Sequence, residues 1–152
     1  MKKSKMLRLL TPDDMYELRL AVYDRAQTSC MGLKLREAGH ERWALHKCGG
    51  RHTGPLTDFS VMDADHIIEQ SWLKASLPLD EAREAAKNPD LCIPVCQVLH
   101  AAKPRLSTKQ LFDLVAENAD ALEAAAKDLN LFYKLNRLFN YDWEKLMKER
   151  EE

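Results

Sequence analysis

The sequence has no apolar run long enough to span a membrane, and its first ten residues lack the apolar h-region of a secretory signal. No charge of one sign dominates either, because 23 Lys and Arg residues stand against 24 Asp and Glu residues, which gives a formal net charge of −1. The protein therefore has no net positive charge that would attract nucleic acid, although a local basic patch would suffice to neutralise a few phosphates. We expect a cytoplasmic protein with no membrane partner.

The four cysteines are unevenly spaced, so we expect reduced thiols rather than a disulfide framework. No segment repeats at the period of a solenoid. With 152 residues, the chain is long enough for one domain with a substantial core.

Two short stretches contain the residues that indicate chemistry. The first is Val61-Met62-Asp63-Ala64-Asp65-His66-Ile67-Ile68, in which an acid and an imidazole follow an apolar run, 59–62, of strand-like composition. The second begins as an apolar run, 91–95, which Pro94 would restrict to the edge of a sheet. From Cys96 it continues as the first turns of a helix, which places His100 on the same helical face as Cys96.

A carboxylate and an imidazole can share one divalent ion and leave positions open for water and substrate. We therefore predict that Asp65 and His100 are metal ligands, and that His66, whose unperturbed pKa lies near neutrality, is a general base. Asp63 has the strand parity of Asp65, so it is an extra ligand, a residue that supports the ligands, or a solvent-facing strand residue. Lys103 lies one helical turn after His100 and could bind the scissile phosphate.

These residues resemble the signature of the His-Asn-His (HNH) endonuclease family. Asp65-His66-Ile67 is followed by Ile93-Pro94-Val95-Cys96 and then by His100-Ala101-Ala102-Lys103, so that the resemblance covers roughly 45–103. It implies a ββα-metal core, which is a short antiparallel hairpin plus a helix, and an endonuclease that hydrolyses DNA phosphodiester bonds. It also implies one divalent ion at the active site, Mg²⁺, Mn²⁺, Ni²⁺ or Zn²⁺. Small free-standing nucleases of this kind resemble phage-encoded or mobile-element enzymes.

The zinc knuckle of many family members is incomplete in this chain. The expected Cys-x-x-Cys pairs fall on Leu45-His46-Lys47-Cys48 and Cys96-Gln97-Val98-Leu99, and in each a leucine replaces one cysteine. We interpret Cys48 and Cys96 as a vestigial knuckle replaced by apolar packing and expect no structural zinc, because a closed zinc site needs four protein ligands. The alternative is a rescued site that adds Cys92, His46 or His52.

The middle asparagine of the family is also displaced. The resemblance implies that either Asp90 or Asn88 orients His66. The alternative for Asn88 is that it ends the preceding helix. In the loop that begins at Cys48, Lys47 and Arg51 could face a phosphate backbone or simply belong to a solvated basic loop.

The rest of the chain is predicted to be mainly helical, which gives an α+β fold in a single domain. The expected helices are 12–26 with Thr11 as its N-cap, 67–77, 78–87 capped near Asp80, 107–118 with a capping box from Ser107, 122–129, 131–139 and 143–151. The segment at 33–45 forms a hairpin or a broken helix. The aromatic residues Phe132, Phe139, Tyr141 and Trp143 are expected in the core.

These elements divide the chain into three regions. They are an N-terminal helical region at 1–44, an HNH-like core at 45–104 with a helical insertion at 67–88, and a C-terminal helical extension at 105–152. The extension is expected to cap the core or to form a homodimer surface.

Two other functions compete with the nuclease. One is the same scaffold without its chemistry, acting as an adaptor or inhibitor through protein or nucleic-acid binding, which the degenerate knuckle and the balanced charge favour. The other is a helical interaction protein in which the motif is a coincidence.

Overall fold

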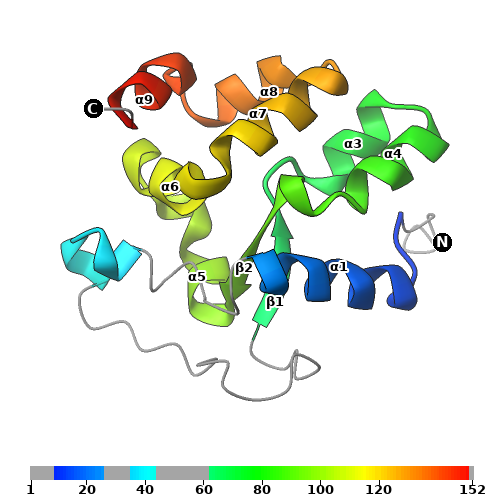
Figure 1. The fold of residues 1–152 in the computed structure, drawn as a ribbon, viewed down its shortest axis with the longest axis horizontal. Coiled ribbons are helices and arrows are strands. Elements are labelled where there is room, and N and C mark those ends of the chain that lie inside the picture. The colour runs from blue at the N-terminus through cyan, green and yellow to red at the C-terminus, as the bar shows by residue number, and fades with distance from the viewer. Residues whose placement is uncertain (1–8, 26–34, 44–61, 151–152) are drawn as a thin grey trace, which may run out of the picture.

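A computed structural model describes residues 9–25, 35–43 and 62–150. Its fold is α+β and mainly helical, with helices arranged around one two-stranded antiparallel sheet (Figure 1). The three described stretches share contacts. Helix α1 (Pro12–Arg25) packs against both strands, and His40 Nε2 lies 2.6 Å from Asp113 Oδ2. Within the third stretch, α7 (Ala119–Asp128) packs on η3 (Pro89–Leu91).

The sheet pairs β1 (Met62–His66) with β2 (Cys92–Cys96), so that Asp65 lies opposite Ile93. The strand includes the acid–imidazole pair, which agrees with the shared strand parity expected for Asp63 and Asp65; residues 59–61 of the apolar run lie outside the described part. Every residue of β2 is buried. Pro94 is tolerated there because both strands of a two-stranded sheet are edges.

Helix α1 begins as the sequence predicts. The Thr11 hydroxyl oxygen accepts a hydrogen bond from the Asp14 amide at 3.1 Å, and the Asp14 carboxylate accepts one from the Thr11 amide at 3.0 Å. The helix then buries Leu18, Val22 and Tyr23. In Figure 1 it crosses in front of the two strands, which explains why these side chains are excluded from water.

The insertion between the two strands is helical, as expected, and consists of α3 (Gln70–Ser76) and α4 (Leu79–Ala86), packed on each other. Asp80 is not the cap of α4, which was the prediction. The N-cap is Pro78, which makes no side-chain cap bond, and Asp80 lies in the first turn, where a carboxylate favours the helix dipole. Asn88 does not end α4 either, because Lys87 is its C-cap and Asn88 instead begins η3.

After β2 the chain turns directly into α5 (Gln97–Ala102), followed by η4 (Lys103–Arg105). Cys96 is the N-cap of α5, and its sulfur accepts a hydrogen bond from the Leu99 amide at 3.4 Å. Between 35 and 43 the structure has a helical turn and η2 (Glu41–Trp43), which favours the broken helix over the hairpin for that part of 33–45.

The C-terminal region consists of α6 (Thr108–Val115), η5 (Ala116–Asn118), α7, α8 (Phe132–Leu138) and α9 (Trp143–Arg150). The capping box at the start of α6 is confirmed, with Ser107 and Gln110 bonding reciprocally. Phe112, Phe139 and Trp143 make edge-to-face contacts with centroid distances of 4.9 to 6.2 Å. Tyr141 is 70% exposed, so its assignment to the core is wrong; it lies in the turn before α9 with φ +66°.

The apolar side chains of these C-terminal helices are largely used inside the chain. Leu122, Leu135, Phe139, Trp143 and Leu146 are buried, which agrees with the cap interpretation, while a homodimer stays a prediction. Among the described residues, no helix is both long and apolar enough to cross a membrane.

Candidate active site

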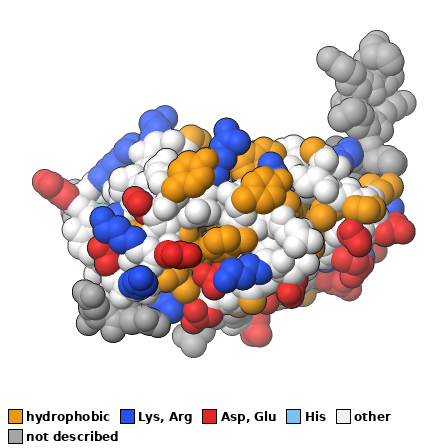
Figure 2. Space-filling model, turned by 90° about the horizontal axis from the view of Figure 1, so that it is seen from above, with side chains coloured by type: hydrophobic (Ala, Val, Ile, Leu, Met, Phe, Trp, Pro, Cys, Tyr) orange, Lys and Arg blue, Asp and Glu red, His pale blue; other side chains and the backbone are white. Residues whose placement is uncertain are grey.

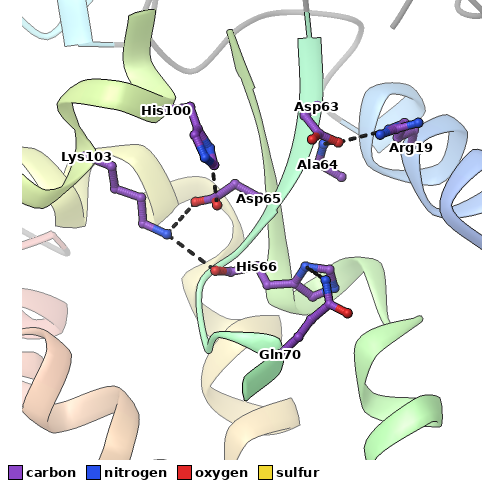
Figure 3. Close-up of polar contacts among 8 residues, drawn as sticks. All are labelled: Arg19, Asp63, Ala64, Asp65, His66, Gln70, His100 and Lys103. Atoms are coloured by element: carbon purple, nitrogen blue, oxygen red, sulfur yellow. Dashed lines mark hydrogen bonds and ion pairs between the residues drawn. The ribbon is translucent and has the colours of Figure 1, made fainter. Parts of the chain in front are cut away.

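Asp65 and His100, the two predicted metal ligands, meet at the junction of β1 and α5 (Figure 3). The Asp65 Oδ1 and His100 Nδ1 atoms are 3.7 Å apart. The carboxylate is largely shielded, with 12% of its side chain exposed, whereas the imidazole is 64% exposed. The pair is therefore open to solvent on the His100 side and closed on the Asp65 side.

Lys103, one helical turn after His100, also contacts Asp65, which the sequence did not predict. Its ammonium donates a hydrogen bond to Asp65 Oδ2 and a second, at 3.3 Å, to the carbonyl oxygen of His66. The two oxygens of Asp65 thus face different partners, one the ammonium and the other the imidazole (Figure 3). A charge-assisted bond of this kind offsets the desolvation of the buried carboxylate.

The imidazole of His66 does not join them. Adjacent residues of a strand point to opposite faces, and the ring of His66 lies on the side of α4, where it is only 6% exposed. Its Nε2–H donates to the Ala86 carbonyl oxygen at 2.8 Å, which leaves Nδ1 unprotonated and 3.5 Å from the Gln70 amide nitrogen. Burial lowers the pKa of His66 below its ordinary value of 6.5 because desolvation disfavours the charged ring.

Asp63 turns away from the group as well. Its Oδ1 accepts hydrogen bonds from Arg19 Nε at 2.9 Å and from the amide of Ala64 at 2.8 Å. Figure 3 shows this carboxylate directed to α1, while that of Asp65 is directed to α5 and η4. Of the three interpretations of Asp63, the solvent-facing strand residue fits best, since its side chain is 49% exposed and forms an ion pair that joins β1 to α1.

Of the two candidates for the middle asparagine, Asn88 uses its side chain to cap η3, and Asp90 bonds through its backbone. Asn88 Oδ1 accepts a hydrogen bond from the Asp90 amide at 3.0 Å, and the carbonyl oxygen of Asp90 accepts one from Asn118 at 3.1 Å. The groups that hold the His66 ring are the Ala86 carbonyl and the Gln70 amide, which sequence reasoning missed. Only the four-residue spacing of Gln70 from His66 could have indicated one of them.

The cysteines of β2 are packing residues in this structure. Cys92 and Cys96 are both buried, and the sulfur of Cys96 caps α5. The other half of the predicted knuckle lies outside the described residues, together with two of the three rescue ligands and two of the predicted phosphate contacts: His46, Lys47, Cys48, Arg51 and His52.

Asp65 and His100 have the chemistry and spacing of two neighbouring ligands of one ion. Ligand atoms about 2.1 Å from an ion, at angles of about 90° to 120°, lie about 3.0 to 3.6 Å apart. The observed 3.7 Å needs only a small adjustment. Over the described ranges no third His, Cys, Asp or Glu gathers with them.

Comparison with known proteins does not extend this description. No family model matches the chain, and neither the curated proteins nor the solved structures include a significant match. The assignment of a function therefore depends on the geometry of Asp65, His100 and Lys103.

Proposed function

We propose that this chain is a divalent-metal-dependent endonuclease of the HNH type that hydrolyses DNA phosphodiester bonds. The observation that carries the proposal is the approach of Asp65 Oδ1 and His100 Nδ1 to 3.7 Å from the two separate halves of the motif. The order β1, β2, α5 supports it further, because a ββα-metal core has an antiparallel strand pair followed by a helix.

In this proposal the chain's own residues have distinct tasks. Asp65 and His100 would hold the ion, and Lys103, beside them, would contact the scissile phosphate. A bound divalent ion supplies a water of lowered pKa and stabilises charge that develops on the phosphate oxygens. The shielding of Asp65 keeps its carboxylate in one orientation, while the exposed His100 leaves room for a duplex to approach.

The role of His66 as general base stays a prediction, and it depends on the orientation of the imidazole ring. Its unprotonated Nδ1 and its lowered pKa suit a base, but its ring is buried against Ala86 rather than turned to Asp65. Catalysis by His66 requires rotation of the ring around the end of β1. Without that rotation His66 is a positioning residue that anchors β1 to α4.

DNA would be bound by a few positively charged side chains near the site rather than by a net positive charge of the whole protein. Figure 2 shows Lys and Arg side chains interspersed with Asp and Glu over the face that it displays. Near the site, η4 adds the exposed Arg105 to Lys103, which gives two cations on one turn. Contacts to a few phosphates predict affinity that falls with salt concentration.

A second candidate, the catalytically inactive binding module, is favoured by two observations. The predicted base faces away from the predicted ligands, and an ammonium already neutralises Asp65. A protein of this kind would keep the scaffold and bind nucleic acid or protein without hydrolysis.

Plasmid cleavage in Mg²⁺, Mn²⁺, Ni²⁺ or Zn²⁺ tests the proposal, with the wild type, Asp65→Asn, His100→Ala and the exposed control Asp80→Asn. We expect nicking by the wild type and the control, and a loss of at least about a hundredfold in the two ligand variants. No cleavage in any metal by folded wild-type protein would favour the binding module. Cleavage by His100→Ala at the wild-type rate would contradict the ligand assignment.

A further inference from the structure

The ammonium of Lys103 lies where it competes with an ion for Asp65. It bonds to Asp65 Oδ2, while Oδ1 of the same carboxylate faces His100 Nδ1. Only 22% of the Lys103 side chain and 12% of the Asp65 side chain are exposed, so water screens this pair poorly. An ion held by Asp65 and His100 would therefore lie close to the ammonium charge of Lys103, which water screens poorly.

The local structure explains why the ammonium is there. Lys103 follows His100 by three residues at the end of α5, and residues three apart share a helical face. The second bond of the ammonium, to the His66 carbonyl oxygen at 3.3 Å, attaches the end of α5 to the end of β1. A shielded carboxylate without a counter-charge is strongly destabilising, so this arrangement suits the protein when no ion is bound.

We propose that Lys103 is a resident counter-cation, which neutralises Asp65 in the metal-free protein and is displaced from the carboxylate when a divalent ion binds. The inference rests on the proposed function, because it takes Asp65 and His100 as the ion's ligands. The flexible four-carbon stem of lysine allows the ammonium to leave the carboxylate without movement of the backbone. Once displaced, it remains within reach of a phosphate bound to the same ion, so metal loading and phosphate capture are coupled.

Two consequences distinguish this role from a purely structural ion pair. Removing the ammonium should raise the affinity for the ion, since the ion no longer has to displace a competitor. The same change should lower the stability of the metal-free protein, since Asp65 loses its counter-charge, and added ion should restore that stability. A structural pair predicts the loss of stability without the gain of affinity.

The test is a titration with Mn²⁺, followed by electron paramagnetic resonance, of the wild type, Lys103→Met, Lys103→Gln and Asp65→Asn. Lys109→Met is the matched control, because Lys109 Nζ pairs with a different carboxylate, Asp113 Oδ1, at 3.1 Å. We expect both Lys103 variants to bind Mn²⁺ about tenfold more tightly than the wild type, and the control to stay within about twofold. Lys103→Gln keeps a hydrogen-bond donor without the charge, so it remains informative if Lys103→Met folds poorly.

Thermal melting in EDTA and in Mn²⁺ provides the second measurement. We expect Lys103→Met to melt about 2 to 4 °C below the wild type in EDTA and to regain more than the wild type on addition of Mn²⁺. Equal or weaker Mn²⁺ affinity in both Lys103 variants, with binding still lost in Asp65→Asn, overturns the displacement and leaves the ion site standing. If the wild type and all variants fail to bind Mn²⁺, or if Asp65→Asn binds it normally, the proposed function and this inference both fail.

Discussion

At the scale of single residues, His66 shows how burial constrains chemistry. Its imidazole is 6% exposed and bonds through Nε2 to the Ala86 carbonyl oxygen, so the folded protein favours the neutral ring and a single tautomer. Burial also lowers the pKa of His66, whereas in the unfolded chain the ring titrates near its ordinary value of 6.5. The two states therefore differ in bound protons over a range of pH at and below 6.5.

This difference predicts acid sensitivity. As the pH falls through 6.5, His66 takes up a proton in the unfolded chain but stays neutral in the folded chain. The contribution of His66 to the free energy of unfolding is therefore fully present above pH 6.5 and is lost as the pH falls towards the lower pKa of the folded state. In that range His66 alone contributes a slope of at most about 1.4 kcal/mol per pH unit. Urea unfolding from pH 7.5 to 5, with EDTA present, measures it.

The matched variant is His66→Gln, whose amide can still donate to Ala86 but does not titrate. We expect the free energy of unfolding to fall less steeply with acid in this variant than in the wild type. Parallel pH curves for the two proteins would show that His66 is not buried as a neutral ring.

A second prediction at this scale separates the two acids of β1. Asp63 pairs with Arg19 at 2.9 Å in a half-exposed position, and such pairs contribute little. We expect Asp63→Asn to lower the free energy of unfolding by no more than about 1 kcal/mol and to leave Mn²⁺ affinity unchanged. Calorimetric titration with Mn²⁺ checks this, and a tenfold loss of affinity would make Asp63 a ligand.

At the scale of elements, the end of η4 and the start of α6 link the site to the C-terminal helices. Ser107 Oγ accepts a hydrogen bond from the Gln110 amide at 3.1 Å, and Gln110 Oε1 accepts one from the Ser107 amide at 2.9 Å. These reciprocal bonds satisfy two backbone donors that a helix start otherwise leaves open. They also determine where the chain turns after Lys103.

We expect Ser107→Ala to lower the free energy of unfolding by about 1 kcal/mol, because it removes the cap acceptor. Ser76→Ala, at the exposed end of α3, is the control and should change stability by no more than about 0.5 kcal/mol. Urea denaturation of the three proteins compares them. Equal losses in both variants would mean that the capping box is not stabilising.

At the scale of the whole molecule, the aromatic cluster of Phe112, Phe139 and Trp143 joins α6 to the last two helices. All three rings are at most 1% exposed, and each contacts the other two edge to face. Trp143 also donates from its indole nitrogen to Glu123 of α7 at 2.6 Å. The C-terminal helices are thus packed into one core, as a cap would be.

We expect Phe139→Ala to lower the free energy of unfolding by about 3 to 5 kcal/mol, because it leaves a cavity within this cluster. Tyr141→Ala, two residues later and 70% exposed, should change stability by no more than about 0.5 kcal/mol. Thermal unfolding of both variants provides the comparison. A small effect of Phe139→Ala would indicate that the C-terminal helices are not needed for the core.

Local sequence signals predicted most of the elements, and tertiary contacts account for the errors. The Thr11 cap and the Ser107 capping box depend on residues within one turn, so they could be read directly from the sequence. The apolar run 59–62 indicated a strand at the acid–imidazole pair, and pairing with β2 shows that this strand extends to His66. Tyr141 was assigned to the core by its apolar neighbours, but the left-handed turn directs it to solvent.

For the candidate site, too, the sequence predicted one part and the tertiary structure decided another. The sequence by itself determined which residues are candidates for the chemistry, and helical spacing placed His100 and Lys103 on one face. Only the tertiary structure decided which partner each side chain contacts. His66 is buried against α4, Asp63 pairs with Arg19 of α1, and the ammonium of Lys103 bonds to the carboxylate of Asp65. The physical reason is that each side chain of β1 contacts the element packed over its face of the strand. That packing depends on contacts between segments that are far apart in the chain.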